Sequence, residues 1–230
     1  MPLAPLFAVH IGPQILQPEW AAGGFAVAAV VVLLGLWKVN EREIPRIGVL
    51  TAAFFVASSV HIPLGGVSVH LLLNGLTGVI LRWRAPLAVA VGLTLQTFLL
   101  SHGGPDALGV NFLVQTVPAL FAGVAFRPLF RTMPAFAAGA SVGGGTAVLT
   151  VLLHAVVLYL GVNVADDEPR KWIAGVSLAA HLPVIVIEAV GVGFACRVLA
   201  KAKPEWLGVE EPPIPLPAAG TEGTVDPSNG

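Results

Sequence analysis

Seven apolar runs follow one another along the chain, and short polar or charged segments separate them. A helix that crosses a membrane needs about 20 mostly apolar residues, and fewer where it is broken or buried in protein. The second run is short for a crossing, and a polar break leads from it into the third. The pattern predicts an all-α polytopic membrane protein with about seven transmembrane helices, over residues 20–37, 47–60, 69–81, 86–100, 112–126, 135–160 and 172–199.

The composition supports this class. Of the 230 residues, 56% are hydrophobic and 11% are charged, whereas a soluble domain has about 25% charged residues. Too few polar side chains are present to coat a soluble globule. The net charge of −1 gives no reason to expect a nucleic-acid partner. The single cysteine, Cys196, excludes a disulfide within the chain and a cysteine-rich metal cluster.

The charged residues predict how the chain is oriented. If the seven runs alternate in direction, ten of the twelve lysines and arginines fall on one side of the membrane, and only Arg170 and Lys171 fall on the other. Cytoplasmic loops carry such an excess of basic residues. We therefore expect the N-terminus outside and the C-terminus in the cytoplasm, in the plasma membrane (bacterial inner membrane). The ten are Lys38, Arg42, Arg46, Arg82, Arg84, Arg127, Arg131, Arg197, Lys201 and Lys203.

The domain organisation follows from the same pattern. Residues 1–203 are expected to form one transmembrane metal-binding domain, in which residues 1–17 are an outer N-terminal segment. Residues 204–230 are rich in Pro, Gly and Glu, a composition that cannot bury a core. We expect a disordered cytoplasmic tail there.

A polar stretch over residues 58–75 stands between the second and third runs. It holds His61 and His70 around Pro63 and a Gly65-Gly66 pair. A helix-breaking insert is costly in lipid unless it is buried in protein or lines a cavity, and ionisable residues there are functional candidates. We expect this stretch to be the centre of a metal site around which the other runs form a cup.

The histidines indicate which metal. On the predicted topology all six lie on the outer side, with His10, His61, His70 and His102 at the mouths of the runs and His154 and His181 deeper. Imidazole suits Ni, Co, Zn and Cu, whereas Mg and Ca prefer oxygen ligands. His70 is the favoured ligand because we expect it to open a helix directly after the Gly-Gly turn. His102, beside another Gly-Gly pair, is a candidate ligand on a lid, although a lone interfacial histidine is more often solvated.

His181 and Glu188 lie seven residues apart, which places them on one face of a helix that Pro183 bends. A carboxylate deep in a span must be paired or protonated. We favour a buried polar latch that ties the last helix to its neighbours over a role near the metal or in translocation. Small residues recur in the first and sixth runs, where they serve either internal packing or docking to a partner.

Motifs for energy conversion and hydrolysis are absent. The sequence holds no phosphate-binding Gly-x-x-x-x-Gly-Lys-Ser/Thr loop, no His-Glu-x-x-His and no Gly-x-Ser-x-Gly. Uphill transport would therefore draw its energy from another subunit.

Three blocks resemble a known family. They are Gly65-Gly-Val-Ser-Val-His70, His102-Gly-Gly-Pro-Asp-Ala-Leu-Gly-Val-Asn111 and His181-Leu-Pro-Val-Ile-Val-Ile-Glu188. In order and spacing, over residues 10–200, they resemble the substrate-binding membrane subunits (S components) of energy-coupling factor transporters for cobalt and nickel, the CbiM/NikM type. The resemblance implies a non-enzymatic importer subunit that uses no cofactor and carries Co²⁺ or Ni²⁺.

The resemblance also implies a metal site and partners. The family's ligands are a free N-terminal amine, the next residue's backbone nitrogen and imidazole, and the histidine of the Gly-Gly-x-Ser-x-His block, which correspond here to His10 and His70. Nine residues precede His10, so the amine chelate requires cleavage after Ala8. Without cleavage, His61 and His102 could supply the missing nitrogens, and such a site would also accept Zn. Ser68, Asn74, Asn111, His181 and Glu188 are expected to support the site or its polar surroundings.

The implied partners are a transmembrane coupling subunit (T), two cytoplasmic ATPase subunits that hydrolyse the ATP, and a possible small accessory membrane subunit. One alternative stays open, an intramembrane metal-dependent enzyme that uses the same histidines to activate water. It would need a general base near the metal, and Asp106 is the main acidic candidate.

Overall fold

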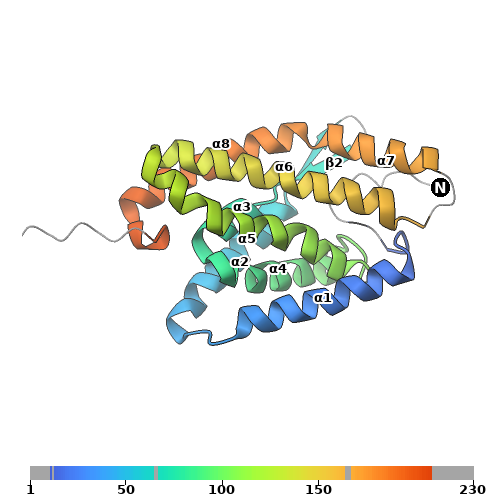
Figure 1. The fold of residues 1–230 in the computed structure, drawn as a ribbon, viewed down its shortest axis with the longest axis horizontal. Coiled ribbons are helices and arrows are strands. Elements are labelled where there is room, and N and C mark those ends of the chain that lie inside the picture. The colour runs from blue at the N-terminus through green and yellow to red at the C-terminus, as the bar shows by residue number, and fades with distance from the viewer. Residues whose placement is uncertain (1–10, 12, 65–66, 164–166, 209–230) are drawn as a thin grey trace, which may run out of the picture.

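The computed structural model describes residue 11 and residues 13–64, 67–163 and 167–208; for residues 61–64, 67–69 and 167–169 it describes the backbone only. Most of this part is helical, and the helices lie side by side in an elongated bundle (Figure 1). The α-helices are α1 (Pro18–Leu36), α2 (Ile44–Ser59), α3 (Asn74–Leu81), α4 (Ala85–Leu100), α5 (Leu108–Thr132), α6 (Ala135–Gly161), α7 (Asp167–Ala180) and α8 (Leu182–Ala202). Short 3-10 helices are η2 (Glu41–Glu43), η3 (Arg82–Arg84) and η4 (Pro204–Trp206), and the strands are β1 (His61–Leu64) and β2 (Val67–His70).

The outer surface of the bundle is apolar. Val124 is 76% exposed, and Leu33 and Phe98 are each 66% exposed. Such a surface suits lipid, because isolated apolar residues are normal on a soluble protein but a continuous apolar exterior is not. Five segments of the described chain are long and apolar enough to cross a membrane, so the protein is a multi-pass membrane protein. They are Pro18–Leu36, Asn74–Leu100, Leu108–Thr132, Ala135–Gly161 and Arg170–Ala202. Seven crossings stay a prediction.

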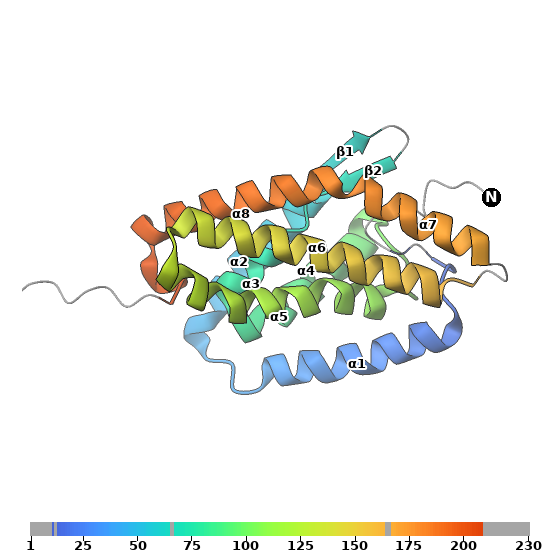
Figure 2. The ribbon, with the colours of Figure 1, turned by 45° about the horizontal axis from the view of Figure 1, so that its top comes forward.

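The expectation of an all-α fold is wrong at the polar stretch. There, β1 and β2 form an antiparallel hairpin in which His61 pairs with His70 (Figure 2). Two β-branched residues, Val67 and Val69, alternate with polar ones in β2, a sequence that suits a strand. The third helix therefore begins at Asn74 and not at residue 69, and His70 ends a strand instead of opening a helix.

The predicted break after the third run is confirmed. Arg82 has φ +57°, which an α-helix of L-residues cannot continue. The segment Asn74–Leu100 is thus two helices, α3 and α4, joined through η3. Similarly, the predicted last helix is broken at His181, where α7 ends and α8 begins with Pro183 in its first turn.

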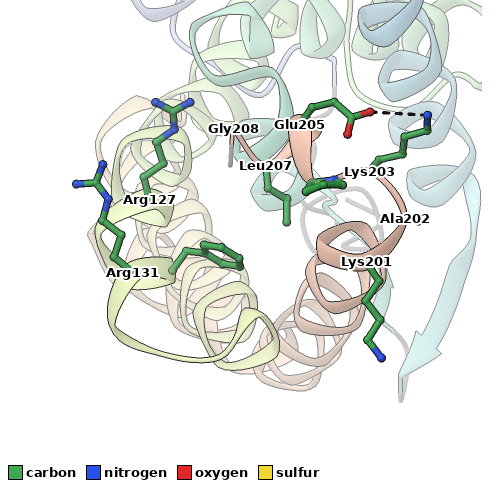
Figure 3. A pocket seen from close by; sticks show the side chains of 10 residues that line it. Arg127, Arg131, Lys201, Ala202, Lys203, Glu205, Leu207 and Gly208 are labelled. Atoms are coloured by element: carbon green, nitrogen blue, oxygen red, sulfur yellow. Dashed lines mark ion pairs between the residues drawn. The ribbon is translucent and has the colours of Figure 1, made fainter. Parts of the chain in front are cut away.

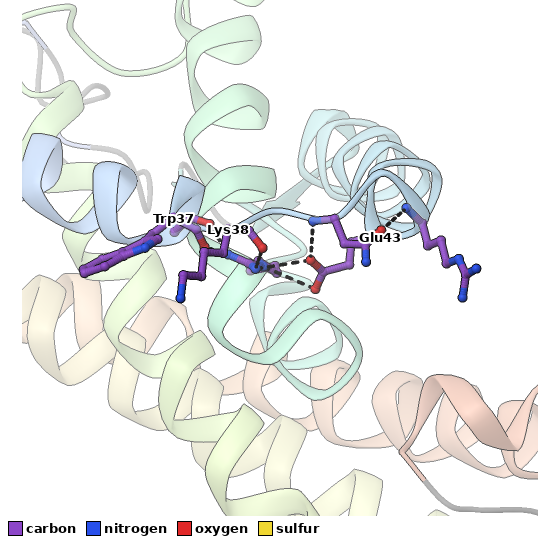
Figure 4. Close-up of polar contacts among 7 residues, drawn as sticks. Trp37, Lys38 and Glu43 are labelled. Carbon is purple, nitrogen blue, oxygen red and sulfur yellow. Dashed lines mark hydrogen bonds and ion pairs between the residues drawn. The ribbon is translucent and has the colours of Figure 1, made fainter.

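Arg84 joins the end of α1 to this break through contacts near Trp37, Lys38 and Glu43, which are labelled in Figure 4. Its side chain is 9% exposed, and its guanidinium donates to the backbone oxygens of Gly35 (2.7 Å), Trp37 (2.8 Å) and Lys38 (2.8 Å). It also forms an ion pair with Glu43. The last carbonyls of a helix have no partner within it, so this contact satisfies α1 where it ends. We call it the Arg84 clamp.

Basic residues gather at one end of the bundle, which we call the basic end. Seven of the ten cations predicted for one side of the membrane line two adjoining pockets there, and both pockets include Arg127. The seven are Arg46, Arg82, Arg84, Arg127, Arg131, Lys201 and Lys203.

The chain remains packed past the predicted boundary at Pro204. Residues Pro204–Trp206 form η4, Leu207 is 2% exposed, and the Arg46 guanidinium lies 5.4 Å from the centre of the Trp206 ring. The expected disordered tail therefore does not begin at Pro204. Its remainder, residues 209–230, lies outside the described residues.

Small residues serve packing inside the bundle. On α6, a Cβ added to Gly143 would lie 2.6 Å from the Cβ of Val192 on α8. On α1, a Cβ at Gly24 would lie 2.9 Å from the backbone nitrogen of Val110 on α5. Glycine at these positions permits close approach of the helices. Gly143 and Gly24 therefore serve internal packing, one of the two roles that the sequence left open.

Candidate metal centre

His70, the favoured ligand, is buried with 1% of its surface exposed. Its Nδ1 lies 2.9 Å from the backbone oxygen of Leu71. A carbonyl can only accept a hydrogen bond, so Nδ1 carries the proton and Nε2 keeps the lone pair. Metal-binding histidines usually hold their second nitrogen in this way, which fixes the tautomer and the direction of the ring.

Glu188 holds the backbone that follows His70. Its Oε1 accepts hydrogen bonds from the backbone N–H groups of Leu72 (2.5 Å) and Leu73 (3.0 Å), and the residue is 3% exposed. Leu73 adopts a left-handed conformation with φ +49°, which is unfavourable for a residue with a side chain. Glu188 thus connects α8 to the segment that carries His70, and its role as a polar latch stays a prediction.

Asn74 continues this polar centre at the start of α3. Its Nδ2 donates to the backbone oxygen of Gln115 on α5 (3.2 Å) and to Oγ1 of Thr150 on α6 (2.8 Å). Asn74 and Gln115 are each 1% exposed, and Thr150 is fully buried. Asn74 was predicted from the sequence but its partners Gln115 and Thr150 were not, although both are polar residues that interrupt apolar runs.

Asn111 binds the N-terminal segment. Its side-chain amide accepts from the backbone N–H of Ile11 (2.9 Å) and donates to the backbone oxygen of Ile11 (3.1 Å). The backbone N–H of Gly104 donates to the same oxygen, and that of Gln14 donates to Asp106 (2.8 Å). Ile11 is thus fixed against the loop and the first turn of α5. His10, the neighbouring predicted ligand, lies outside the described residues.

Asp106 is the acid that the enzyme alternative required. In the structure it accepts the Gln14 hydrogen bond and holds the N-terminal segment. This contact supports a role in positioning the chain, and nothing in the described geometry supports activation of water by Asp106.

The remaining predicted ligands are placed less completely. His61 is described by its backbone alone, opposite His70 in the hairpin, and Ser68 lies opposite Pro63. His102 follows α4, where its backbone N–H donates to Gln96 (3.1 Å). Within the described residues, no three His, Cys, Asp or Glu side chains form a group that could hold a metal ion. Convergence of the four histidines therefore stays a prediction.

His181 does not share one continuous helix with Glu188. It stands between α7 and α8, fully buried, and its Nδ1 donates to the backbone oxygen of Ser177 at 2.6 Å. The ring centre of His154 on α6 lies 6.3 Å from that of His181. These contacts place His181 in the joint of two helices and in the packing against α6.

Comparisons with known proteins agree with this arrangement. The family model described as "Cobalt uptake substrate-specific transmembrane region" matches residues 10–206. A "Putative metal transport protein" of Haemophilus influenzae is 30% identical over 209 residues, which cover 88% of this chain and 98% of that protein. A "Cobalt transport protein CbiM" of Geobacter sulfurreducens is 30% identical over 88% of this chain and 62% of its own length.

Two further matches are a solved structure with the same fold and a longer, fused relative. A crystal structure titled as a transition metal transporter covers 84% of this chain and 93% of its own, with a TM-score of 0.69 and 20% identity, and shows the shared fold. A "Putative fused cobalt transport protein CbiMQ" of Methanocorpusculum labreanum is 27% identical over 77% of this chain and 35% of that protein. The chain is a member of the family of cobalt uptake substrate-specific transmembrane regions, the membrane components of cobalt and nickel transport.

Proposed function

We propose that the chain is the substrate-binding membrane subunit of an ATP-driven energy-coupling factor importer, and that it binds Co²⁺ or Ni²⁺ through histidines at the outer face. The observation that carries this proposal is the state of His70. The ring is buried, its Nδ1–H donates a hydrogen bond to the backbone oxygen of Leu71, and Glu188 on α8 fixes the adjoining backbone. This preorganises one imidazole nitrogen as a ligand.

The other ligands are proposed from their neighbours. Ile11 is bound by Asn111, so residue 10 directly precedes a fixed point of the chain. His61 is paired with His70, and residues at paired positions of a hairpin share one face. An imidazole-rich set of His10, His70 and His61, with His102 from the loop after α4, favours Co²⁺ or Ni²⁺ over Mg²⁺ and Ca²⁺.

The proposed topology has seven crossings, with the N-terminus outside and the basic end in the cytoplasm. Its support is the gathering of seven cations around the two pockets at one end, because cytoplasmic loops are enriched in Lys and Arg. The helix α2 and the segment from β1 through α3 would provide the two crossings that fall below the length of an ordinary span.

The proposed partners are a coupling subunit in the membrane and two ATPases, with room for a small accessory membrane subunit. The sequence holds no phosphate-binding loop, so the energy must come from elsewhere. The fused relative supports this arrangement, since there a region similar to this chain occupies only 35% of a longer transport protein.

Metal analysis of the purified full chain tests the proposal. We expect about one bound Co²⁺ or Ni²⁺ per chain after incubation and desalting, and a loss of binding in His70→Ala. Parallel His61→Ala and His102→Ala variants measure their contribution, and the mass of the mature N-terminus shows whether the residues before Val9 are removed. His154→Gln, on α6, is the control and should keep its metal. Retention of metal by His70→Ala would refute the assigned site.

A further inference from the structure

A pocket of about 970 Å³ opens at the basic end between the end of α5 and the end of α8 (Figure 3). Arg127 and Arg131 lie on one side of it and Lys201 and Lys203 on the other. Among the described residues that line it, the one carboxylate is Glu205, which pairs with Lys203 at 3.7 Å. The lining therefore carries a clear excess of positive charge.

Arg127 is the least compensated of these cations. Its Nε is buried and makes no hydrogen bond within the described part of the chain. The guanidinium of Arg127 lies against the backbone of Gly208, which has φ +68°. A side chain at position 208 would overlap the guanidinium. The positive charge of Arg82 acts on Arg127 as well, and like charges repel. An anion in the pocket would relieve this repulsion and supply a partner.

Exposed apolar residues precede the cations of the pocket on both helices. Val124, 76% exposed, stands three residues before Arg127 and seven before Arg131, hence on the same face of α5. Phe194 and Val198, 52% and 61% exposed, stand seven and three residues before Lys201 on α8. On both helices a large apolar surface thus leads directly to basic side chains, the order in which a lipid presents its acyl chains and its phosphate.

We propose that this pocket binds the headgroup of an anionic phospholipid, with its phosphate among Arg127, Arg131 and Lys201 and its acyl chains along Val124 and Val198. Basic pockets between membrane helices bind anionic headgroups in this way. The phosphate chemistry is shared with free anions, but the adjoining apolar faces select a lipid. This site is separate from the metal centre, and its occupation does not depend on the transported ion.

Lipid binding to the full chain tests this assignment. The chain is purified in a neutral detergent, and its apparent Kd for dioleoylphosphatidylglycerol and dioleoylphosphatidylcholine is measured by native mass spectrometry. We expect binding of the anionic lipid at least tenfold tighter, and weaker binding as the salt concentration rises. Arg131 and Lys201 are exposed, so their replacement leaves the packing intact.

The double variant Arg131→Gln/Lys201→Gln should bind the anionic lipid about thirtyfold more weakly, since each basic residue near an anionic surface contributes about fivefold (~1 kcal/mol). Arg42→Gln, an exposed cation outside the pocket, is the matched control and should bind like the unchanged chain. Equal affinity for the two lipids, or an equal loss in Arg42→Gln, would overturn the proposal. Binding of glycerol 3-phosphate or inorganic phosphate as tight as that of the lipid would overturn it too, in favour of a soluble anion.

Discussion

Replacing Glu188 tests whether α8 controls the metal centre from outside it. Glu188→Ala removes the oxygen that accepts from Leu72 and Leu73 and leaves one buried and one partly buried backbone donor without this partner. A buried donor left unsatisfied costs about 1–3 kcal/mol, so the segment after His70 loses up to about 6 kcal/mol of ordering free energy. Leu73 would also leave its left-handed conformation more readily, which relieves about 1–2 kcal/mol of that loss.

This local loss should reach the metal through His70. If the binding-competent arrangement becomes a minor state, the apparent Kd rises by the inverse of its population. A net loss of about 2 kcal/mol corresponds to about thirtyfold in the apparent Kd. Glu188→Gln retains an oxygen that can accept both hydrogen bonds, so its apparent Kd should lie between that of the unchanged chain and that of Glu188→Ala.

Calorimetric titration of the purified chain with Co²⁺ measures these affinities, and thermal unfolding in the same detergent measures stability. The matched control is Val186→Ala on the same helix, where the side chain is 63% exposed to lipid. If Glu188→Ala unfolds at a lower temperature but binds Co²⁺ with unchanged Kd, then Glu188 only joins helices and the coupling to His70 is refuted. An affinity loss in Val186→Ala of the same size would equally count against it.

Three further outcomes are expected. Arg84→Met should destabilise the chain by about 1–3 kcal/mol in a reversible unfolding assay, because it leaves the buried carbonyl of Gly35 at the end of α1 without its donor. Gly78→Ala should destabilise by about 3 kcal/mol, since its Cβ would overlap the carbonyl of Ala119, whereas Gly145→Ala, with open space around it, should be neutral or stabilising by up to about 1 kcal/mol. The pKa of Glu43 lies below its ordinary value of 4.5, first because of the Asn40 backbone hydrogen bond and then because of Arg84. The carboxylate therefore stabilises the fold above pH 4.5, and this stabilisation is lost as the pH falls through the lowered pKa. Glu43→Gln should abolish this part of the pH dependence of the unfolding free energy.

The apolar runs were readable from the sequence because a membrane imposes one requirement on every crossing segment. The break at Arg82 was readable for a similar reason, since a charged pair ends an apolar run. The hairpin was missed because a short apolar run does not distinguish strand from helix by its periodicity. Residues 69–73 continue the apolar pattern into α3, and only pairing with β1 makes Val69 and His70 part of a strand.

The metal centre was predictable in its residue types but not in its supports. His70 and Glu188 were predicted because each stands at a fixed position of a sequence block. The partners of Glu188 are backbone N–H groups, which have no signature in the sequence. The Arg84 clamp was missed for the same reason, because three of its acceptors are carbonyls at the end of α1. Charge sorting assigned Arg84 to the cytoplasmic side and said nothing of its burial.

The helix α1 is fastened by hydrogen bonds at its two ends and packs against α5 between them. The Arg84 clamp holds one end, and the backbone hydrogen bond from Gln17 to Gly161 holds the other. Between them, within α1 itself, only Gly24, Ala28 and Gly35 are buried. A rod of 19 residues has a fixed length of about 28 Å, close to the roughly 30 Å of a bilayer's hydrocarbon core. The length of α1 therefore matches the hydrocarbon core on its own, which neither α2 with 16 residues nor α3 with 8 can do.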